Sequence, residues 1–478
     1  MILHQIRNAE SGREAPARDE CAAAMRTLLL LALAALAPAN PNGLGRLPPR
    51  GWNTWCTGAS CDQPNITLGF PASGLHDNCS EATIKSVASD MVTNGMLAAG
   101  WDHINMDDCW GATNLQYPGG VRGDGPYRWD PQRFPSGIPA LASWLHARGF
   151  KFGLYTASGN STCSSGGRKG FVPGSVGHFE QDAQTFADWG VDYVKLDWCI
   201  HAEKAPTPAV FALRQNRTNQ MAMAMNKTGR PMWLTFHCEY SKGHASGQFA
   251  EWCARDGNSW RIGPDHHDNW FSLEQVIQVL GKAAANGRPF RWNDPDFLMT
   301  GGAGCDVTMP GKRCPGMSEV EYRTEFSLWT MGAASMILST DPRNMTAFMR
   351  STLLQNEMLA IHRDPLGISG GKVADHINAA DFCGHTDDCQ VWARPLADGS
   401  WAMALFNRQP YDNENPTAPG HAATITGNWS SLPSPPAAGA KLKVRDVWLA
   451  KDLGTFAGSY TAEDVPPHAT VFLHLELA

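Results

Sequence analysis

Short runs rich in β-branched and aromatic residues alternate with amphipathic stretches from about residue 50 to residue 361. Eight such runs are predicted as strands, over residues 51–55, 102–108, 152–156, 191–197, 232–239, 259–262, 290–294 and 336–340. The helices predicted between and after them cover residues 138–148, 181–189, 209–226, 272–285, 321–334 and 345–361. Eight strands, six of them followed by a predicted helix, within roughly 310 residues favour a (β/α)8 TIM barrel over a doubly wound sheet.

The pattern changes after about residue 388. Residues 390–396, 401–407, 442–449 and 470–477 alternate polar and apolar side chains, with loop-like segments at 416–420 and 432–439. This alternation is typical of a small antiparallel β-sandwich. The sequence therefore predicts a barrel domain over residues 40–388 and a C-terminal β-sandwich domain over residues 389–478.

A short apolar segment precedes the barrel. Met25 and Arg26 lead into an apolar run from Leu28 to Ala37, and small residues flank Pro38 at a cleavage position. The run is too short to span a bilayer, so residues 25–39 are predicted to be a secretory signal peptide within an N-terminal extension of residues 1–39. The alternatives are an N-terminal anchor or a buried helix. No later run is apolar and long enough to predict a membrane span.

The cysteines agree with secretion. Of the 13 cysteines, Cys21 precedes the predicted cleavage site, which leaves an even set of 12. An even set in a secreted chain indicates disulfides, and no Cys-x-x-Cys pair points to zinc. Glycosylation sequons support the prediction of a secreted or vacuolar/lysosomal glycoprotein, and they lie at Asn65, Asn78, Asn160, Asn216, Asn226, Asn344 and Asn428.

The charge balance limits the partners. There are 39 Lys and Arg against 46 Asp and Glu, a net charge of −7, so no basic field exists to hold nucleic acid or anionic lipid. The 18 tryptophans supply flat apolar faces that suit sugar rings, although most Trp side chains simply pack in cores.

Acidic residues follow most of the predicted barrel strands. In a (β/α)8 barrel the active site forms at the C-terminal ends of the strands. Any one acid there is more often a helix cap than a catalytic group. Together with Lys195 and Arg261, however, the acids would form a cup for a neutral polyhydroxylated ligand, and two of them could cleave a glycosidic bond as nucleophile and proton donor. The acids are Asp107, Asp108, Asp197, Glu239, Asp265, Asp294, Asp296 and Asp341.

Metal and cofactor chemistry is disfavoured. The segment Asp265-His266-His267-Asp268 contains metal-binding residue types, but adjacent histidines point apart and His-x-x-x-His spacing is missing. The glycine-rich residues 301–304 lack the Lys-Ser/Thr of a phosphate loop and the spacing of a dinucleotide turn. We therefore predict no metal ion and no organic cofactor.

Four segments resemble the signatures of glycoside hydrolase family 27, the melibiase-type α-galactosidases. They are residues 101–110 (WDHINMDDCW), 191–199 (VDYVKLDWC), 259–270 (SWRIGPDHHDNW) and 292–298 (WNDPDFL), with support from residues 51–55, 130–135, 181–189 and 364–367. The resemblance implies a retaining α-galactosidase that removes terminal α-D-galactosyl residues through a covalent glycosyl-enzyme intermediate. The substrate is left open among galactoside oligosaccharides, polysaccharide side chains and glycolipids, and a homodimer is left open too.

The resemblance also implies a role for individual residues. Asp197 matches the nucleophile and Asp265 the general acid/base, at a carboxyl separation of about 5–5.5 Å in retaining enzymes. Lys195 would help to keep Asp197 ionised, whereas Asp265 must be protonated, which calls for a raised pKa and a mildly acidic working pH. The expected substrate-binding residues are Trp55, Asp107, Asp108, Tyr155, Lys195, Glu239, Arg261 and Asp296.

Specificity depends on two of these positions. Glu239 resembles the galactosidase side of the family, where a Glu contacts the 2-hydroxyl, rather than the N-acetylgalactosaminidases. The Asp107–Asp108 pair leaves space for a 6-hydroxymethyl group, which argues against a pentopyranosidase. The alternatives are α-N-acetylgalactosaminidase or β-L-arabinopyranosidase activity, and a non-catalytic sugar-binding protein, which the presence of both catalytic carboxylates disfavours.

The cysteines are assigned in the same way. Cys163–Cys199 and Cys238–Cys253 match family disulfides, while Cys305–Cys314 and Cys383–Cys389 would close local loops. Cys56, Cys61, Cys79 and Cys109 are expected to form two more bridges, with three connectivities open.

Overall fold

The computed structural model describes residues 42–55, 79–163, 169–199, 207–238, 251–302, 316–343, 345–377, 383, 386–409 and 421–478. No helix within these ranges is long and apolar enough to cross a membrane. Several predicted features lie outside the described residues, namely the signal peptide with Cys21, the sequons at Asn65, Asn78 and Asn344, and Glu239, Cys56, Cys61, Cys305 and Cys314.

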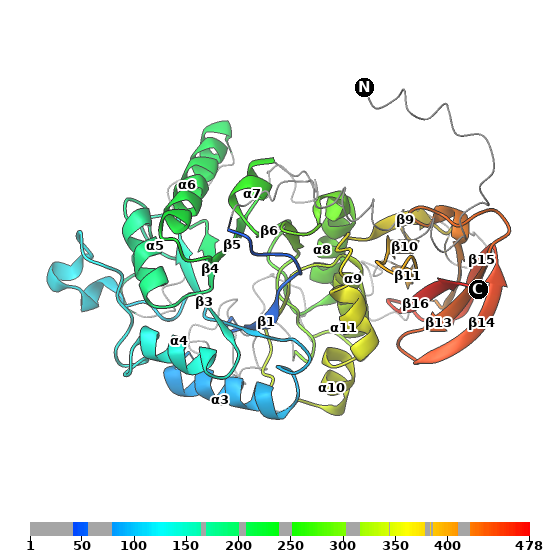
Figure 1. The fold of residues 1–478 in the computed structure, drawn as a ribbon, viewed down its shortest axis with the longest axis horizontal. Coiled ribbons are helices and arrows are strands. Elements are labelled where there is room, and N and C mark those ends of the chain that lie inside the picture. Colours follow the sequence, from blue (N-terminus) through cyan, green and yellow to red (C-terminus); the bar gives the residue numbers. More distant parts are fainter. Residues whose placement is uncertain are drawn as a thin grey trace, which may run out of the picture. The chain divides into compact units, whose positions relative to one another are not determined.

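Eight parallel strands form the barrel, in the order β7-β6-β5-β4-β3-β2-β1-β8 (Figure 1). Each lies within or overlaps one of the predicted strand segments, so the eight-strand prediction is confirmed. The strands are β1 (Arg50–Asn53), β2 (His103–Asn105), β3 (Lys151–Ala157), β4 (Tyr193–Asp197), β5 (Trp233–His237), β6 (Ser259–Arg261), β7 (Trp292–Asp294) and β8 (Met336–Leu338).

A parallel bridge between Leu298 and Leu338 joins the two ends of this sheet. The Leu298 N–H donates to the carbonyl of Ile337 at 2.8 Å, and the Ser339 N–H donates to the carbonyl of Leu298 at 2.9 Å. Leu298 comes four residues after the end of β7, so a short segment beyond the strand closes the barrel.

Helices surround the strands in Figure 1. They are α3 (Glu81–Thr93), α4 (Ile138–His146), α5 (Phe179–Asp188), α6 (Pro208–Lys227), α7 (Glu251–Asp256), α8 (Trp270–Ala283), α9 (Glu319–Met331), α10 (Ala347–Leu353) and α11 (Asn356–His362). Among these, α3 and α7 were not predicted from the sequence.

The prediction of a single helix over residues 345–361 is wrong, because the helix is interrupted at Gln355, between α10 and α11. Gln355 has extended backbone angles (φ −69°, ψ 105°) and its side chain accepts the N–H of Met358, which makes it the N-cap of α11. Its amide nitrogen also donates to the carbonyl of Val447 at 2.7 Å, in the C-terminal part of the chain. This tertiary contact is invisible in the helical periodicity.

Buried tryptophans fill much of the barrel's core. The indole N–H groups of Trp101, Trp110 and Trp292 donate to backbone carbonyls at 3.0, 3.0 and 2.7 Å, and all three side chains are at most 1% exposed. These indoles therefore satisfy their polar group inside the protein.

The C-terminal part is an antiparallel β-sandwich. A six-stranded sheet has the order β14-β13-β16-β11-β10-β9, and β12 pairs with β15 in a second, two-stranded sheet. Apolar side chains such as Leu405, Ile425 and Leu442 form the core of this region. The strands are β9 (Gly371–Asp375), β10 (Cys389–Pro395), β11 (Trp401–Asn407), β12 (Ala423–Asn428), β13 (Lys441–Asp446), β14 (Lys451–Ala457), β15 (Ser459–Val465) and β16 (Thr470–Leu477).

Strands β10, β11, β13 and β16 match the four predicted segments, whereas the other four were not predicted. β9 and β14 are the two edges of the large sheet, and neither contains a fully buried residue. An edge strand that is only partly covered does not need strictly alternating apolar residues, so its pattern is weak. β9 pairs with β10 although it precedes residue 389, the predicted start of the sandwich.

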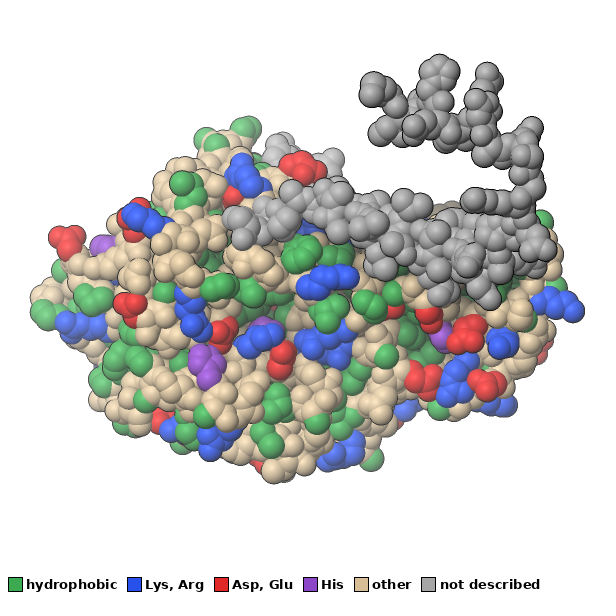
Figure 2. All heavy atoms as spheres, viewed as in Figure 1, with side chains coloured by type: hydrophobic (Ala, Val, Ile, Leu, Met, Phe, Trp, Pro, Cys, Tyr) green, Lys and Arg blue, Asp and Glu red, His purple; other side chains and the backbone are tan. Residues whose placement is uncertain are grey.

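Charged and aromatic contacts connect α9 and its neighbours to the sandwich strands. His468 stacks on Trp270 at 3.8 Å between ring centroids, and its Nδ1 lies 2.7 Å from Oε1 of Glu321. Arg445 pairs with Glu357 of α11 at 2.7 Å. On the face drawn in Figure 2, basic and acidic side chains are interspersed among polar and apolar ones.

We expect Leu298→Ala to destabilise the barrel. Leu298 is fully buried next to the closing bridge, and a truncated buried leucine typically costs about 2–5 kcal/mol in the free energy of unfolding. Leu449→Ala is the matched control, because Leu449 is 69% exposed and its loss should cost less than about 0.5 kcal/mol. Urea unfolding followed by tryptophan fluorescence measures both variants. Equal midpoints would contradict the role of Leu298 in closing the barrel.

Candidate active site

Charged side chains converge where the parallel strands end. Asp197, Arg261 and Asp294 are the last residues of β4, β6 and β7, and Asp107 and Asp108 follow β2. Because the C-terminal ends of all barrel strands lie at one edge, these groups come together there. The carboxylate of Asp341 pairs instead with Arg343 of its own loop at 2.5 Å.

The carboxylate of Asp197 is held by three neighbours. The hydroxyl of Tyr155 donates to Oδ2 at 2.9 Å, the N–H of Trp198 donates to Oδ1 at 2.6 Å, and Nε2 of His237 lies 3.2 Å from Oδ1. Burial raises the pKa of Tyr155, so its hydroxyl stays a donor. Burial alone would raise the pKa of Asp197, but His237, Lys195 and the Trp198 N–H hold that pKa well below its ordinary value. Asp197 is therefore an oriented, ionised carboxylate.

Lys195 lies two residues before Asp197, on the same face of β4. Its ammonium donates to Oδ2 of Asp107 at 2.9 Å and lies 5.1 Å from the ring centre of Phe297. Burial would lower the pKa of Lys195, but the charges of Asp107, Asp197 and Asp296 raise it above its ordinary value. Lys195 thus stays protonated and neutralises part of the acidic cluster.

Arg261 bridges the other side of the site. One guanidinium nitrogen lies 2.9 Å from Oδ1 of Asp265 and 3.0 Å from Oδ2 of Asp296. Asp296 has φ 86°, a conformation that favours glycine, and Oδ1 of Asp294 accepts its backbone N–H at 3.0 Å. Backbone strain of this kind is often found at functional sites, where the surrounding contacts maintain it.

The electrostatics of Asp265 differ from the expectation of a raised pKa. Loss of hydration within the site would raise the pKa of Asp265, but the charge and hydrogen bond of Arg261, together with the charge of His237, hold it below its ordinary value. The side chain is 67% exposed, so its carboxyl group is accessible to a ligand. Without a ligand, Asp265 is therefore protonated only in acid.

A buried network lies behind Asp265. Nε2 of His266 is 3.1 Å from Oε1 of Glu325, and Nδ1 of His266 is 3.1 Å from the hydroxyl of Ser272. Glu325 also accepts the Met299 N–H at 2.8 Å and the Thr300 hydroxyl at 3.1 Å. His266 thus helps to hold together the loops after β6 and β7. This structural role accounts for the first histidine of the segment Asp265-His266-His267-Asp268.

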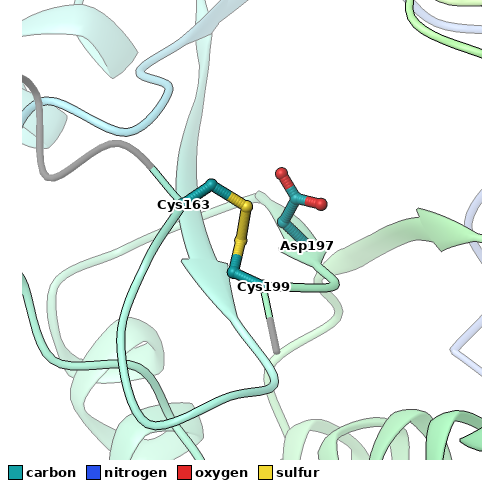
Figure 3. A group of neighbouring side chains, drawn as sticks. All are labelled: Cys163, Asp197 and Cys199. Atoms are coloured by element: carbon teal, nitrogen blue, oxygen red, sulfur yellow. A yellow bond between two sulfur atoms is a disulfide. The ribbon is translucent and has the colours of Figure 1, made fainter. Parts of the chain in front are cut away.

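The described residues contain one cluster of metal-ligating types, formed by Cys163, Asp197 and Cys199 (Figure 3). Cys163 and Cys199 are joined in a disulfide, so their sulfur atoms are not available as thiolate ligands. This cluster therefore consists of the candidate nucleophile Asp197 beside a disulfide.

Disulfides flank three of the charged strand ends. Cys109 directly follows Asp108 and is bonded to Cys79, Cys199 is bonded to Cys163, and Cys238 directly follows His237 and is bonded to Cys253. Cys79–Cys109 decides among the three connectivities that the sequence left open, while Cys383–Cys389 closes the loop before β10. These crosslinks limit the movement of the segments that carry the site.

Of the predicted substrate-binding residues, the structure describes all but Glu239. Lys195 lies 6.0 Å from the ring centre of Trp55 and 5.2 Å from that of Tyr155, so both rings border its ammonium group. Asp107 and Asp108 are buried, at 2% and 4% exposure. Sequence analysis missed His237, although its place at the end of β5, in register with Arg261, was a usable signal.

Family models match both parts of the chain. The model described as "Alpha galactosidase A" matches residues 48–364, and the one described as "Alpha galactosidase C-terminal beta sandwich domain" matches residues 386–475. The first covers more than half of the chain. The chain belongs to glycoside hydrolase family 27, the melibiase-type α-galactosidases.

Known members of family 27 align over most of the chain. An alpha-galactosidase of Coffea arabica is 34% identical over 421 residues, covering 88% of this chain and 92% of the relative. One of Oryza sativa subsp. japonica is 33% identical over 427 residues, covering 89% and 84%. The crystal structure of alpha-galactosidase I from Mortierella vinacea superposes with a TM-score of 0.69 at 26% identity, covering 91% of this chain and 98% of that one. This family 27 member is accordingly an enzyme that hydrolyses glycosides, and its substrate is a carbohydrate.

We expect Glu325→Ala to destabilise the protein. The change leaves His266, the Met299 N–H and the Thr300 hydroxyl without their buried acceptor, at a cost of about 3 kcal/mol in the free energy of unfolding. Glu319→Ala, on the exposed first turn of α9, is the control. Thermal unfolding of the two variants measures the effect, and a Glu325→Ala midpoint equal to that of the control would refute the network.

Proposed function

We propose that this enzyme removes terminal α-D-galactosyl residues with retention of configuration, with Asp197 as nucleophile and Asp265 as acid/base. The observation that carries the proposal is the contrast between the two carboxyl groups. Asp197 is mostly enclosed, ionised and held by three neighbours, with its side chain 17% exposed, whereas the side chain of Asp265 is 67% exposed and pairs with Arg261 at one edge of the site. A nucleophile and a proton carrier need this difference.

In the first step, an oxygen of Asp197 attacks the anomeric carbon while Asp265 gives its proton to the departing glycosidic oxygen. The anomeric C–O bond breaks, a glycosyl ester forms on Asp197, and the aglycone leaves as an alcohol. Tyr155 and the Trp198 N–H keep the carboxylate oriented for this attack.

In the second step, Asp265 takes a proton from water, and the resulting oxygen nucleophile displaces Asp197 from the sugar. The charge of Asp197 acts to raise the pKa of Asp265 in the free enzyme. Ester formation removes that charge, so the pKa of Asp265 falls further when it must act as a base. The reaction itself thus changes the acidity of Asp265 in the required direction.

We assign sugar recognition to the remaining charged groups. Asp107 and Asp108 would accept hydrogen bonds from the 4- and 6-hydroxyls, with Lys195, Arg261 and Asp296 contacting further hydroxyls and Trp55 and Tyr155 forming walls. A buried carboxylate such as Asp107 needs donors, and a sugar hydroxyl can supply one beside Lys195. The assignment of Glu239 to the 2-hydroxyl stays a prediction.

We further propose passage through the secretory pathway and a division into a barrel domain and a C-terminal sandwich domain, with the predicted boundary at 388/389 moved ahead of β9, because β9 pairs with β10. The four disulfides of the described residues support an oxidising compartment. The natural galactoside stays open among oligosaccharide, polysaccharide and glycolipid, and the homodimer stays a prediction.

Asp197→Asn should abolish turnover of 4-nitrophenyl α-galactoside, with kcat reduced about 10⁴-fold or more, because the amide is a poor nucleophile. Asp265→Asn should lose about 10²–10⁴-fold on an unactivated galactoside and less on the nitrophenyl substrate, whose leaving group needs little protonation. Asp188→Asn, on the exposed end of α5, is the matched control. Full activity of Asp197→Asn would refute the assignment of the nucleophile.

Initial rates on the nitrophenyl α-galactoside, α-N-acetylgalactosaminide and β-L-arabinopyranoside test the sugar. We expect the α-galactoside to dominate. A preference for either other sugar would replace the proposed specificity, and no turnover by the folded protein would favour a sugar-binding role.

The rate should fall as the pH rises through the pKa of Asp265, because the general acid must be protonated. That pKa is lowered in the free enzyme, so the decline should begin at acidic pH. The lowered pKa of Asp197 keeps the nucleophile ionised well below that range. A profile of kcat/KM that still rises above about pH 8 would contradict this.

A further inference from the structure

His237 is the last residue of β5, and its imidazole faces the carboxylate of Asp197 on the neighbouring strand β4. Nε2 of His237 lies 3.2 Å from Oδ1 of Asp197, and the His237 side chain is 13% exposed. A nitrogen this close to an ionised carboxylate carries its hydrogen, so Nε2 donates in both the neutral and the charged forms of the ring.

His237 differs from the other two groups that bind Asp197. The Tyr155 hydroxyl and the Trp198 N–H stay neutral donors over the whole range in which the enzyme works. An imidazole gains or loses a positive charge near neutral pH. It therefore adds a charge that depends on pH to the surroundings of the nucleophile.

The backbone around His237 has little freedom to move the ring away. Cys238 follows directly and is bonded to Cys253, and the Cys238 N–H donates to the carbonyl of Arg261 at 3.2 Å. The chain is therefore attached to β6 immediately after His237, which keeps the imidazole directed at Asp197.

We propose that His237 is a positioning residue that holds the Asp197 carboxylate for attack and sets the pH range of turnover through the charge of its imidazole. The inference rests on the proposed role of Asp197 as nucleophile. It adds a residue and a source of pH dependence that the catalytic pair alone does not contain.

Charged groups from three strands face the same space. They are Lys195 and Asp197 of β4, Arg261 of β6 with Asp265 in the following loop, and Asp294 of β7 with Asp296 beyond it. Lys195, His237, Arg261, Asp294 and Asp296 line one cavity within the barrel mouth. The acids favour a charged imidazole, whereas the two cations oppose it.

The charge of His237 acts on both carboxyl groups in one direction. Against the effect of burial, it helps to lower the pKa of Asp197 and, after Arg261, that of Asp265. Removing the charge should therefore raise both pKa values. Both limbs of the pH–rate profile should then move to higher pH, a change that a merely structural histidine would not produce.

His237→Leu and His237→Gln separate the hydrogen bond from the charge. The leucine variant should lose about 10- to 100-fold in kcat with KM nearly unchanged, since a hydrogen bond to a charged group is removed. The glutamine variant retains an N–H donor and should recover most of kcat. Both variants should show the shifted pH limbs, whereas His421→Gln, exposed in the sandwich, should match the wild type.

A wild-type pH profile and kcat in His237→Leu would overturn the proposal. Equal losses in both variants together with a lowered unfolding midpoint would also overturn it, because they would indicate a structural role. Recovery of kcat by glutamine with both limbs shifted would support it.

A mechanism-based label keeps this test apart from the proposed function. A 2-deoxy-2,2-difluoro α-galactoside with a good leaving group should trap a glycosyl ester, which peptide mapping by mass spectrometry can locate. A label on a carboxylate other than Asp197 in the wild type would overturn both the proposed nucleophile and this inference. A label on Asp197 that forms equally fast in the wild type and both His237 variants would overturn this inference alone.

Discussion

Ion pairs between Lys195, Arg261 and the surrounding carboxylates hold the barrel mouth together. Parallel strands carry their C-terminal acids to one edge, where like charges would repel. Lys195 of β4 binds Asp107 after β2, and Arg261 of β6 binds Asp265 and Asp296 in the following loops. Each cation thus joins separate strand ends, and the same contacts that stabilise the fold prepare the charges for a sugar.

Rigid supports surround this charged cluster. Disulfides follow Asp108, Asp197 and His237 within one or two residues, and the buried His266–Glu325 contact holds the loops after β6 and β7. Preorganised groups need no rearrangement during the reaction, so the energy of substrate binding can go into the transition state. Glycosidic cleavage requires this precision because two carboxyl groups must act on opposite parts of one bond.

Two side chains of one chemical type acquire different properties here through their surroundings. Asp197 is half-buried among donors, while Asp265 is accessible and bound to Arg261. The pKa of Asp265 is lowered, although the sequence analysis expected a raised pKa for the general acid. The charges of Arg261 and His237 account for the difference. How near these two side chains lie to Asp265 could not be inferred from spacing along the chain.

The sequence by itself determined the eight-stranded barrel, the sandwich and the acids at the strand ends, because local periodicity and strand termini are properties of short segments. It also led to family 27 through motifs that lie at those termini. Tertiary structure decided the helix interruption at Gln355 and the pairing of edge strand β9 with β10 and of edge strand β14 with β13. It also decided the Cys79–Cys109 bridge and the contact of His237 with Asp197. Each of these depends on a distance between segments far apart in the chain, and such distances exist only once the barrel has closed.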